Sequence, residues 1–175
     1  MCIRDSNTAL AKDAVGRYEF ALKRPARREL WKYTPARQII DLRRLPATQP
    51  LLSGHEQAGI TVTASPACLD LADLVCIQRA PEAFAQLCSQ PLLHIAVTAD
   101  LIQPVTLHHQ GNSSPVIIDV ASGVRMTLTE EYDNDCDQQQ TMWLRLGTKS
   151  EVTHARNTFS GAALHWQFVS VQVQA

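Results

Sequence analysis

The sequence lacks the compact motifs that mark the common enzyme classes. It has only seven glycines in 175 residues, with neither a glycine-rich phosphate-binding loop nor a Gly-x-Ser-x-Gly nucleophile elbow. The cysteines are odd in number and none are spaced as Cys-x-x-Cys, so neither a disulfide framework nor a zinc finger is expected. We interpret all five as small buried thiols: Cys2, Cys68, Cys76, Cys88 and Cys136. We therefore expect no autonomous enzymatic activity.

Long apolar runs are also missing. No run approaches the roughly 20 residues needed to span a bilayer. The first residues, MCIRDSNTALAKD, lack the apolar stretch of a secretory signal. The default compartment is therefore the cytoplasm, and no membrane partner is expected. Residues 1–6 resemble a leader that is not native to the protein.

Charge is nearly balanced overall but unevenly distributed. Residues 1–44 hold 11 of the 16 Lys and Arg and 5 of the 17 acidic residues, whereas the remainder holds 5 basic and 12 acidic residues. This asymmetry indicates two segments with different surfaces. The basic run 23–28, followed by Trp31 and Tyr33, could track a nucleic-acid backbone. A cationic helical arm that docks on an acidic surface is the better interpretation, so no nucleic-acid partner is expected.

The first two segments of the chain are expected to differ in structure. Residues 1–58 predict a helical segment, because apolar residues recur every four positions from Leu10 to Leu22. Thr34-Pro35 offers a hydroxyl cap and a first-turn proline for a second helix. The end of this segment, from Pro46, is dotted with proline, serine and glycine, which is typical of a surface connection. Residues 59–90 predict a mixed α/β connection.

The third segment, residues 91–175, repeats a plan of strand, short turn and strand. Its units begin at Leu92, Val116, Met142 and Leu164, which are 24, 26 and 22 residues apart. Stacked units of this kind would form a solenoid. An antiparallel meander with hairpin turns explains the same spacing, and periodicity alone does not separate the two.

Alternation within the units predicts which side chains face the core. Val116, Ile118 and Val120 share one face of a strand, while Asp119 points the other way. In the next strand Val124, Met126 and Leu128 oppose their polar neighbours at 125, 127 and 129. Each unit thus has one apolar face that must be covered.

Six histidines raise the possibility of a metal site. His108 and His109 are adjacent in a strand, so their side chains point to opposite faces and cannot share an ion. His94 and His108 could stack across a turn, with Glu130 or Glu131 on the next unit. This gives an alternative function, a small β-fold metalloprotein or metalloenzyme that uses strand histidines. Ordinary strand histidines are the better interpretation.

An acidic stretch resembles the start of a calcium-binding loop. Asp133, Asp135 and Asp137 have the spacing of the first EF-hand ligands, but Gln138 replaces the required glycine and Leu144 the bidentate glutamate. Together with residues 138–140, all glutamine, this stretch predicts a solvated loop between units.

The stretch RRELWKYT is the most distinctive in the chain. Its motif resembles the Glu-x-Trp-Lys-Tyr-Thr signature of the SufB/SufD family of iron–sulfur cluster assembly proteins, and points to the SufD branch. The order of later elements also agrees: GITVT, PEAFAQL, LLHIAV, a Pro-x-x-Leu-His element and a Glu-Glu-Tyr stretch. The matching motif residues are Glu29, Trp31, Lys32, Tyr33 and Thr34. We interpret this motif as structural, with the aromatic side chains anchoring the helical arm.

The resemblance implies a fold and a set of partners. It implies a mainly β protein with N-terminal helices, in which the first coils of a right-handed parallel β-helix follow a small helical segment. Residues 91–175 would be the truncated start of that β-helix. The implied function is a non-enzymatic SufD-like scaffold that acts with a SufB-like subunit and a SufC-like ATPase and is associated with iron entry. An iron–sulfur cluster and reduced flavin belong to the full complex, and no cluster or iron ligand is assigned before Ala175.

Overall fold

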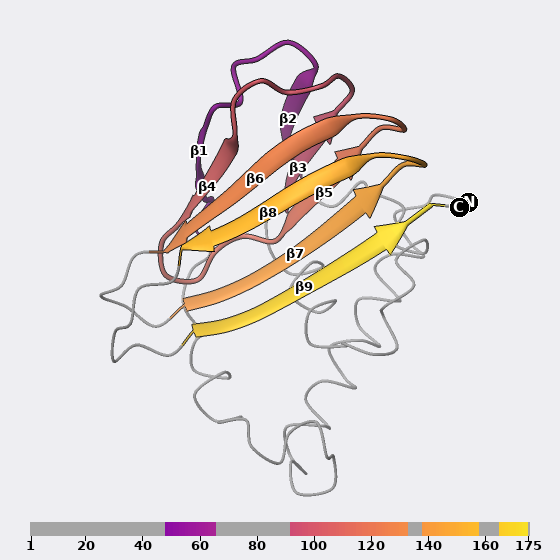
Figure 1. Ribbon diagram of the computed structural model, residues 1–175. Coiled ribbons are helices and arrows are strands. Elements are labelled where there is room, and N and C mark those ends of the chain that lie inside the picture. Colours follow the sequence, from indigo (N-terminus) through magenta and orange to yellow (C-terminus); the bar gives the residue numbers. More distant parts are fainter. Residues whose placement is uncertain (1–47, 66–91, 133–137, 158–164, 175) are drawn as a thin grey trace, which may run out of the picture.

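The computed structural model describes residues 48–65, 92–132, 138–157 and 165–174. These residues form a mainly β structure of two mixed sheets (Figure 1). The strands are β1 Leu51–Ser53, β2 Ile60–Ser65, β3 Leu92–Val97, β4 Val105–His109, β5 Val116–Val120, β6 Arg125–Tyr132, β7 Gln138–Leu146, β8 Glu151–Asn157 and β9 His165–Val173. The helices predicted before residue 46 and from Pro81, the Glu29–Thr34 motif and all five cysteines lie outside the described residues. Within them, no helix is long and apolar enough to cross a membrane.

Successive strands alternate between the two sheets. One sheet has the order β2-β3-β5-β7-β9 and the other β1-β4-β6-β8. From β3 onward every neighbouring pair is parallel, while β1 and β2 join β4 and β3 in antiparallel fashion. Figure 1 shows β8 running opposite to β7 and β9. The two strands of one unit therefore do not pair with each other.

This pairing decides between the two interpretations of the repeat. Leu93 pairs with Val116, Val116 with Met142, and Met142 with Val169, so the register advances by 23, 26 and 27 residues. In the described strands each unit pairs with the next unit, and the hairpin meander is wrong. The predicted unit start at Leu164 was also misplaced in register, because Val169 lies opposite Met142.

The apolar core fills the space between the two sheets. The predicted alternation is confirmed for both strands of the second unit: Val116, Ile118 and Val120, and also Met126 and Leu128, are buried. Apolar side chains of the other units join them in one cluster. Burial of each such side chain is worth about 1.5–3 kcal/mol, and no unit buries its apolar face without a neighbour.

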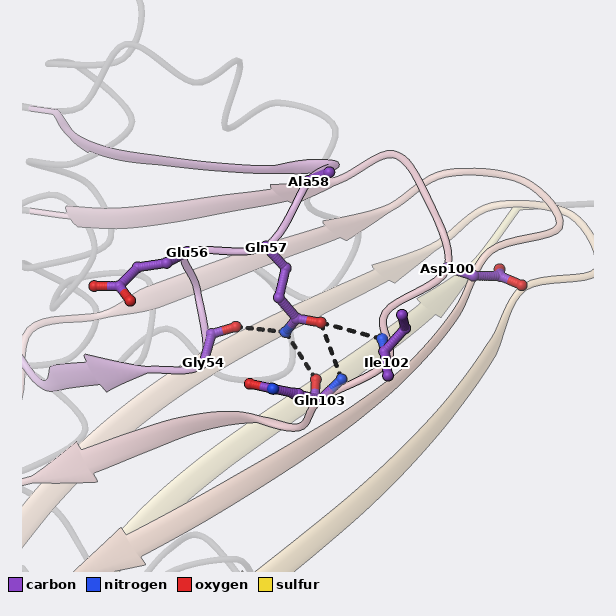
Figure 2. A pocket seen from close by; sticks show the side chains of 7 residues that line it. All are labelled: Gly54, Glu56, Gln57, Ala58, Asp100, Ile102 and Gln103. Carbon is purple, nitrogen blue, oxygen red and sulfur yellow. Dashed lines mark hydrogen bonds between the residues drawn. The ribbon is translucent and has the colours of Figure 1, made fainter.

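The segment predicted as a surface connection contains a strand. Leu51–Ser53 forms β1 at the edge of the four-stranded sheet, and the loop 54–59 then crosses to β2 in the other sheet. The side-chain amide of Gln57 fixes this loop by donating to the carbonyls of Gly54 and Gln103 and accepting from the amide of Ile102 (Figure 2). Such side-chain bonds replace the ladder hydrogen bonds that a loop lacks.

Candidate functional site

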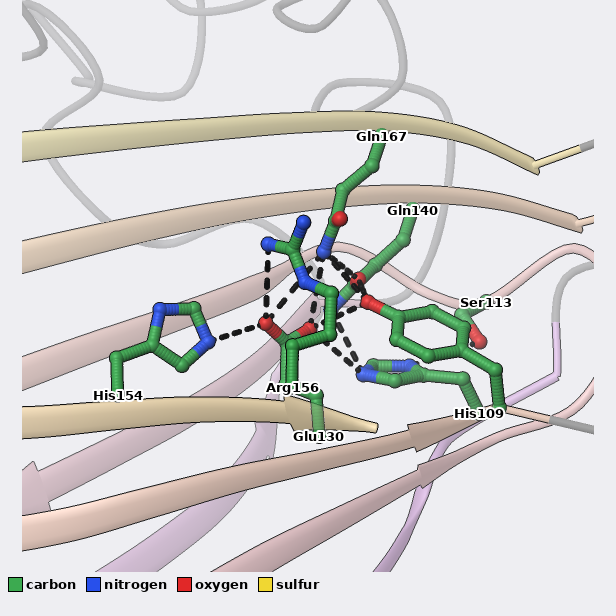
Figure 3. Close-up of polar contacts among 8 residues, drawn as sticks. His109, Ser113, Glu130, Gln140, His154, Arg156 and Gln167 are labelled. Carbon is green, nitrogen blue, oxygen red and sulfur yellow. Dashed lines mark hydrogen bonds and ion pairs between the residues drawn. The ribbon is translucent and has the colours of Figure 1, made fainter. Parts of the chain in front are cut away.

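The inward-facing positions change from apolar to polar at one end of the strand stack. In β4, Val105 and Leu107 are followed at the same parity by His109, and in β6 Leu128 is followed by Glu130. The first residues of β7 and β9 lie at this end, because these strands run in the direction opposite to the strands of the other sheet (Figure 1). The result is a buried polar cluster (Figure 3). Its members are His109, Ser113, Glu130, Tyr132, Gln140, His154, Arg156 and Gln167.

Glu130 is the centre of this buried polar cluster. Its side chain has 0% exposure, yet its carboxylate contacts donors from three other strands. His109 Nε2 lies 3.2 Å from Oε2, the Nε2 of His154 contacts Oε1, and Arg156 Nη2 lies 3.5 Å from Oε1. Gln167 Nε2 donates to Oε2 over 3.1 Å. A buried carboxylate is tolerated only with such compensation.

Tyr132 joins the carboxylate to the two glutamines. Its hydroxyl donates to Glu130 Oε2 over 2.7 Å and also contacts Gln140 Oε1. Gln140 and Gln167 occupy paired positions of β7 and β9, and Gln167 Nε2 donates to Gln140 Oε1 over 2.7 Å. The Tyr132 ring stacks on the His109 ring with a centroid distance of 4.9 Å.

The placement of protons in the cluster follows from these partners. Gln140 Oε1 accepts hydrogen bonds, so its Nε2 faces His109 Nε2 at 2.8 Å. That ring nitrogen can accept from the amide or donate to Glu130, but it cannot do both. When it accepts, the ring proton lies on Nδ1, which is 3.1 Å from Ser113 Oγ. The Tyr132 hydroxyl likewise has one proton for two acceptors, so protons can shift while heavy atoms stay in place.

The electrostatics keep Glu130 ionised and Tyr132 neutral. Burial by itself would raise the pKa of Glu130, but hydrogen bonds from His109, His154 and Tyr132 outweigh it and hold this pKa well below its ordinary value. Burial raises the pKa of Tyr132, and the adjacent Glu130 charge raises it further. The cluster is therefore a satisfied buried charge network, with His154, Arg156 and Gln167 partly exposed at its rim.

The structure does not bring together the histidines and glutamates of the alternative metal site. His94 lies on β3 and pairs with Asp119 Oδ2 at 2.8 Å, on the sheet opposite to His108. His108 pairs with Glu131 on the outer face, whereas Glu130 points inward to His109 and His154. Strand alternation is the physical reason, because neighbouring residues face opposite sides. Among the described residues no group of three His, Cys, Asp or Glu side chains is arranged to hold a metal ion.

Two smaller charge groups lie outside the buried polar cluster. Asp119 accepts from Arg145 of the next unit as well as pairing with His94, so the three side chains link β3, β5 and β7. At the other end of the stack, Asp100 Oδ1 accepts from the Arg125 backbone amide over 2.9 Å and its Oδ2 pairs with the guanidinium. The Arg125 side-chain hydrogen bond lowers the pKa of Asp100.

One prediction about a loop was wrong, and one lies outside the described residues. Gln138–Gln140 begin β7 instead of forming a solvated loop, and Gln140 is 1% exposed. Gln140 is tolerated inside because both ends of its side-chain amide find partners in the cluster. Asp133, Asp135 and Asp137 of the expected calcium-like stretch are not among the described residues.

Sequence reasoning missed most of the cluster, although a signal was present. Glu130 was considered, but with the wrong histidines. His109 and His154 have the same parity as the apolar residues Leu107 and Val152 of their strands, which marks them as inward-facing. A polar residue at an inward position of an alternating strand must find a buried partner, and this rule would have grouped them.

Comparison with known proteins adds no relative. No protein-family model, no curated protein and no solved structure matches the chain.

Proposed function

We propose that this chain is a SufD-like scaffold subunit of iron–sulfur cluster assembly. The observation that carries the proposal is the parallel register, in which Leu93, Val116, Met142 and Val169 succeed one another across four strands. Unit-on-unit pairing of this kind is the architecture that the resemblance of the Glu29–Thr34 motif implies. The scaffold would act with a SufB-like subunit and a SufC-like ATPase, and the cluster would be its cargo.

The same pairing supports a right-handed parallel β-helix as the finer description of the fold. Each strand of the five-stranded sheet from β3 onward reaches its parallel neighbour by crossing through the other sheet. Connections between parallel strands of one sheet are right-handed in nearly all proteins, because of strand twist. The first coils would then be β3–β4, β5–β6 and β7–β8.

The buried polar cluster supports a structural role within such a scaffold. Its groups satisfy one another through hydrogen bonds and ion pairs that link strands of both sheets. A fully satisfied polar network rigidifies a core and favours a single arrangement. Rigidity is the property that a subunit needs to hold partners in fixed geometry.

Co-purification tests the proposal. The chain would be tagged at the full length of its open reading frame and expressed with the SufB-like and SufC-like subunits of the same genome. The expected result is a stoichiometric complex. A SufB-like and SufC-like pair that purifies without the tagged chain would overturn the proposal.

A Trp31→Ala variant tests the motif. If the motif is structural, the variant should have a lower melting temperature but should still bind its partners at temperatures below that melting point.

Metal content separates the proposal from the alternative metalloprotein. Mass spectrometry of the isolated chain should find no stoichiometric metal if the chain is a scaffold. Tightly held metal that is lost in His94→Ala or His108→Ala would favour the metalloprotein instead.

A further inference from the structure

Three side chains on the outer face of the four-stranded sheet form a hydrogen-bonded row. Ser53 Oγ of β1 lies 3.3 Å from His108 Nε2 of β4. His108 Nδ1 lies 2.9 Å from Glu131 Oε2 of β6. The order of atoms, hydroxyl to Nε2 and Nδ1 to carboxylate, is that of a nucleophile, a base and an orienting acid.

The strand register fixes this row. His108 and Glu131 are direct partners in the parallel β4–β6 pair. Ser53 is the partner of Thr106 in the antiparallel β1–β4 pair, so it lies diagonal to His108 on the same face. Diagonal and direct neighbours on one face are within side-chain reach. The geometry therefore rests on backbone pairing across three strands rather than on a flexible loop.

The partners also set the proton position on His108. An ionised carboxylate only accepts hydrogen bonds, so the neighbouring Nδ1 carries the proton. In the neutral imidazole Nε2 is then the acceptor nitrogen, which can take the proton of the Ser53 hydroxyl. This is the tautomer that a general base requires.

We propose that Ser53, His108 and Glu131 form a nucleophilic site that is acylated by small carboxylic esters. Ser53 Oγ attacks the ester carbonyl carbon while His108 Nε2 takes its proton, and Glu131 stabilises the imidazolium. The bond to the alkoxy oxygen then breaks, the alcohol leaves with that proton, and an acyl-serine remains. Water, activated by the same imidazole, hydrolyses it and restores the hydroxyl. This activity is separate from the scaffold function.

The surroundings define the kind of ester. Gly54 follows Ser53 and lines an open pocket of about 460 Å³ (Figure 2). The residue after a nucleophilic serine commonly supplies a backbone donor to the oxyanion. Glu56 and Asp100 contribute carboxylates to the pocket, and its described lining residues include no basic side chain. An ester with a small acyl group and a neutral or cationic polar part fits this chemistry.

Covalent labelling tests the site directly. The full chain would be treated with a fluorophosphonate probe, followed by peptide mass spectrometry, and its hydrolysis of p-nitrophenyl acetate would be followed in parallel. The expected adduct is on Ser53. Ser53→Ala should abolish labelling, and His108→Gln should slow it by at least about tenfold. Glu131→Gln should slow it by about tenfold, because the imidazole loses its orienting charge.

The control variant is Ser122→Ala, which removes an exposed serine of the turn between β5 and β6. It should leave labelling and hydrolysis unchanged. Unlabelled Ser53 under conditions that label a known serine esterase would overturn the proposal. So would ester hydrolysis that survives in Ser53→Ala but is lost in His108→Gln, because the imidazole alone would then be the nucleophile.

Discussion

The two ends of the strand stack are held together by different means. At the turn end, successive turns are joined by backbone hydrogen bonds, such as Gly147 N to Val120 O over 2.8 Å and Gly123 N to Thr148 O over 2.9 Å. At the opposite end, side chains of the buried polar cluster converge on Glu130. The turn end repeats from unit to unit, whereas the polar end is built once from different residues.

This difference has an energetic consequence. A backbone hydrogen bond at the turn end contributes about 1 kcal/mol, and its loss can be compensated by water. At the polar end a lost partner leaves a buried charge or several buried donors unsatisfied. Removing one side chain at the polar end should therefore destabilise the whole cluster strongly. Removing one hydrogen bond at the turn end should cause a small and local loss of stability.

Removing the central carboxylate should have the largest effect. Glu130→Ala leaves His109, Tyr132 and Gln167 without their common acceptor, and we expect a loss of about 4 kcal/mol in the free energy of unfolding. Urea denaturation followed by circular dichroism measures it. The matched control is Glu131→Ala, one residue along β6, which removes a half-exposed partner of His108 and should cost at most about 1 kcal/mol. Equal losses for the two variants would contradict a special role for the polar end.

Acid should act through the same residue. The pKa of Glu130 in the folded protein is lowered from its ordinary value of 4.5. Ionised Glu130 therefore stabilises the fold fully above pH 4.5, and this stabilisation is lost as the pH falls further. We expect the wild type to lose about 2 kcal/mol more than Glu130→Gln between pH 6 and pH 3. Thermal melts of both proteins across this range provide the measurement. If the melting temperatures of the two proteins fall equally with pH, the acid sensitivity arises from other residues.

The repeated part of the structure is the part that the sequence predicts well. The starts of β3 at Leu92 and of β5 at Val116 agree with the predicted units, because alternation of apolar residues reports directly on the buried face. Alternation alone does not distinguish parallel from hairpin pairing, since both bury the same residues, and only the resemblance to the SufB/SufD family favoured parallel pairing.

The buried polar cluster was not predicted from the sequence, and the reason is different. Gln138–Gln140 looks like a loop by composition, yet Gln140 is buried because Tyr132 and Gln167 satisfy its amide. Those partners come from strands 8 and 27 residues away. Composition has no information on such partners, so the signal for the cluster was the inward parity of His109, Glu130 and His154.

Steric crowding tests the turn end. A Cβ at Gly147 would lie 2.5 Å from the backbone nitrogen of Ser122, so two successive turns would have to separate. We expect Gly147→Ala to cost about 2 kcal/mol. Gly123→Ala is the comparison, because φ is +76° there and a Cβ meets nothing within 4 Å. It should cost about 1 kcal/mol from backbone strain alone. Chemical denaturation of both variants checks the order, and a larger loss for Gly123→Ala would refute close turn stacking.

The smallest effect is a gain in stability at the turn end. Lys149 has a positive φ of 61° and occupies the position that corresponds to Gly123 one unit earlier, since Arg125 pairs with Glu151. Lys149→Gly relieves the left-handed strain but adds chain entropy to the unfolded state, so we expect a net gain of about 0.5 kcal/mol. Lys149→Ala removes the same charge and keeps the strain, and it should leave the melting temperature nearly unchanged. If both variants raise it equally, charge rather than backbone geometry is responsible, and the two turns are not equivalent.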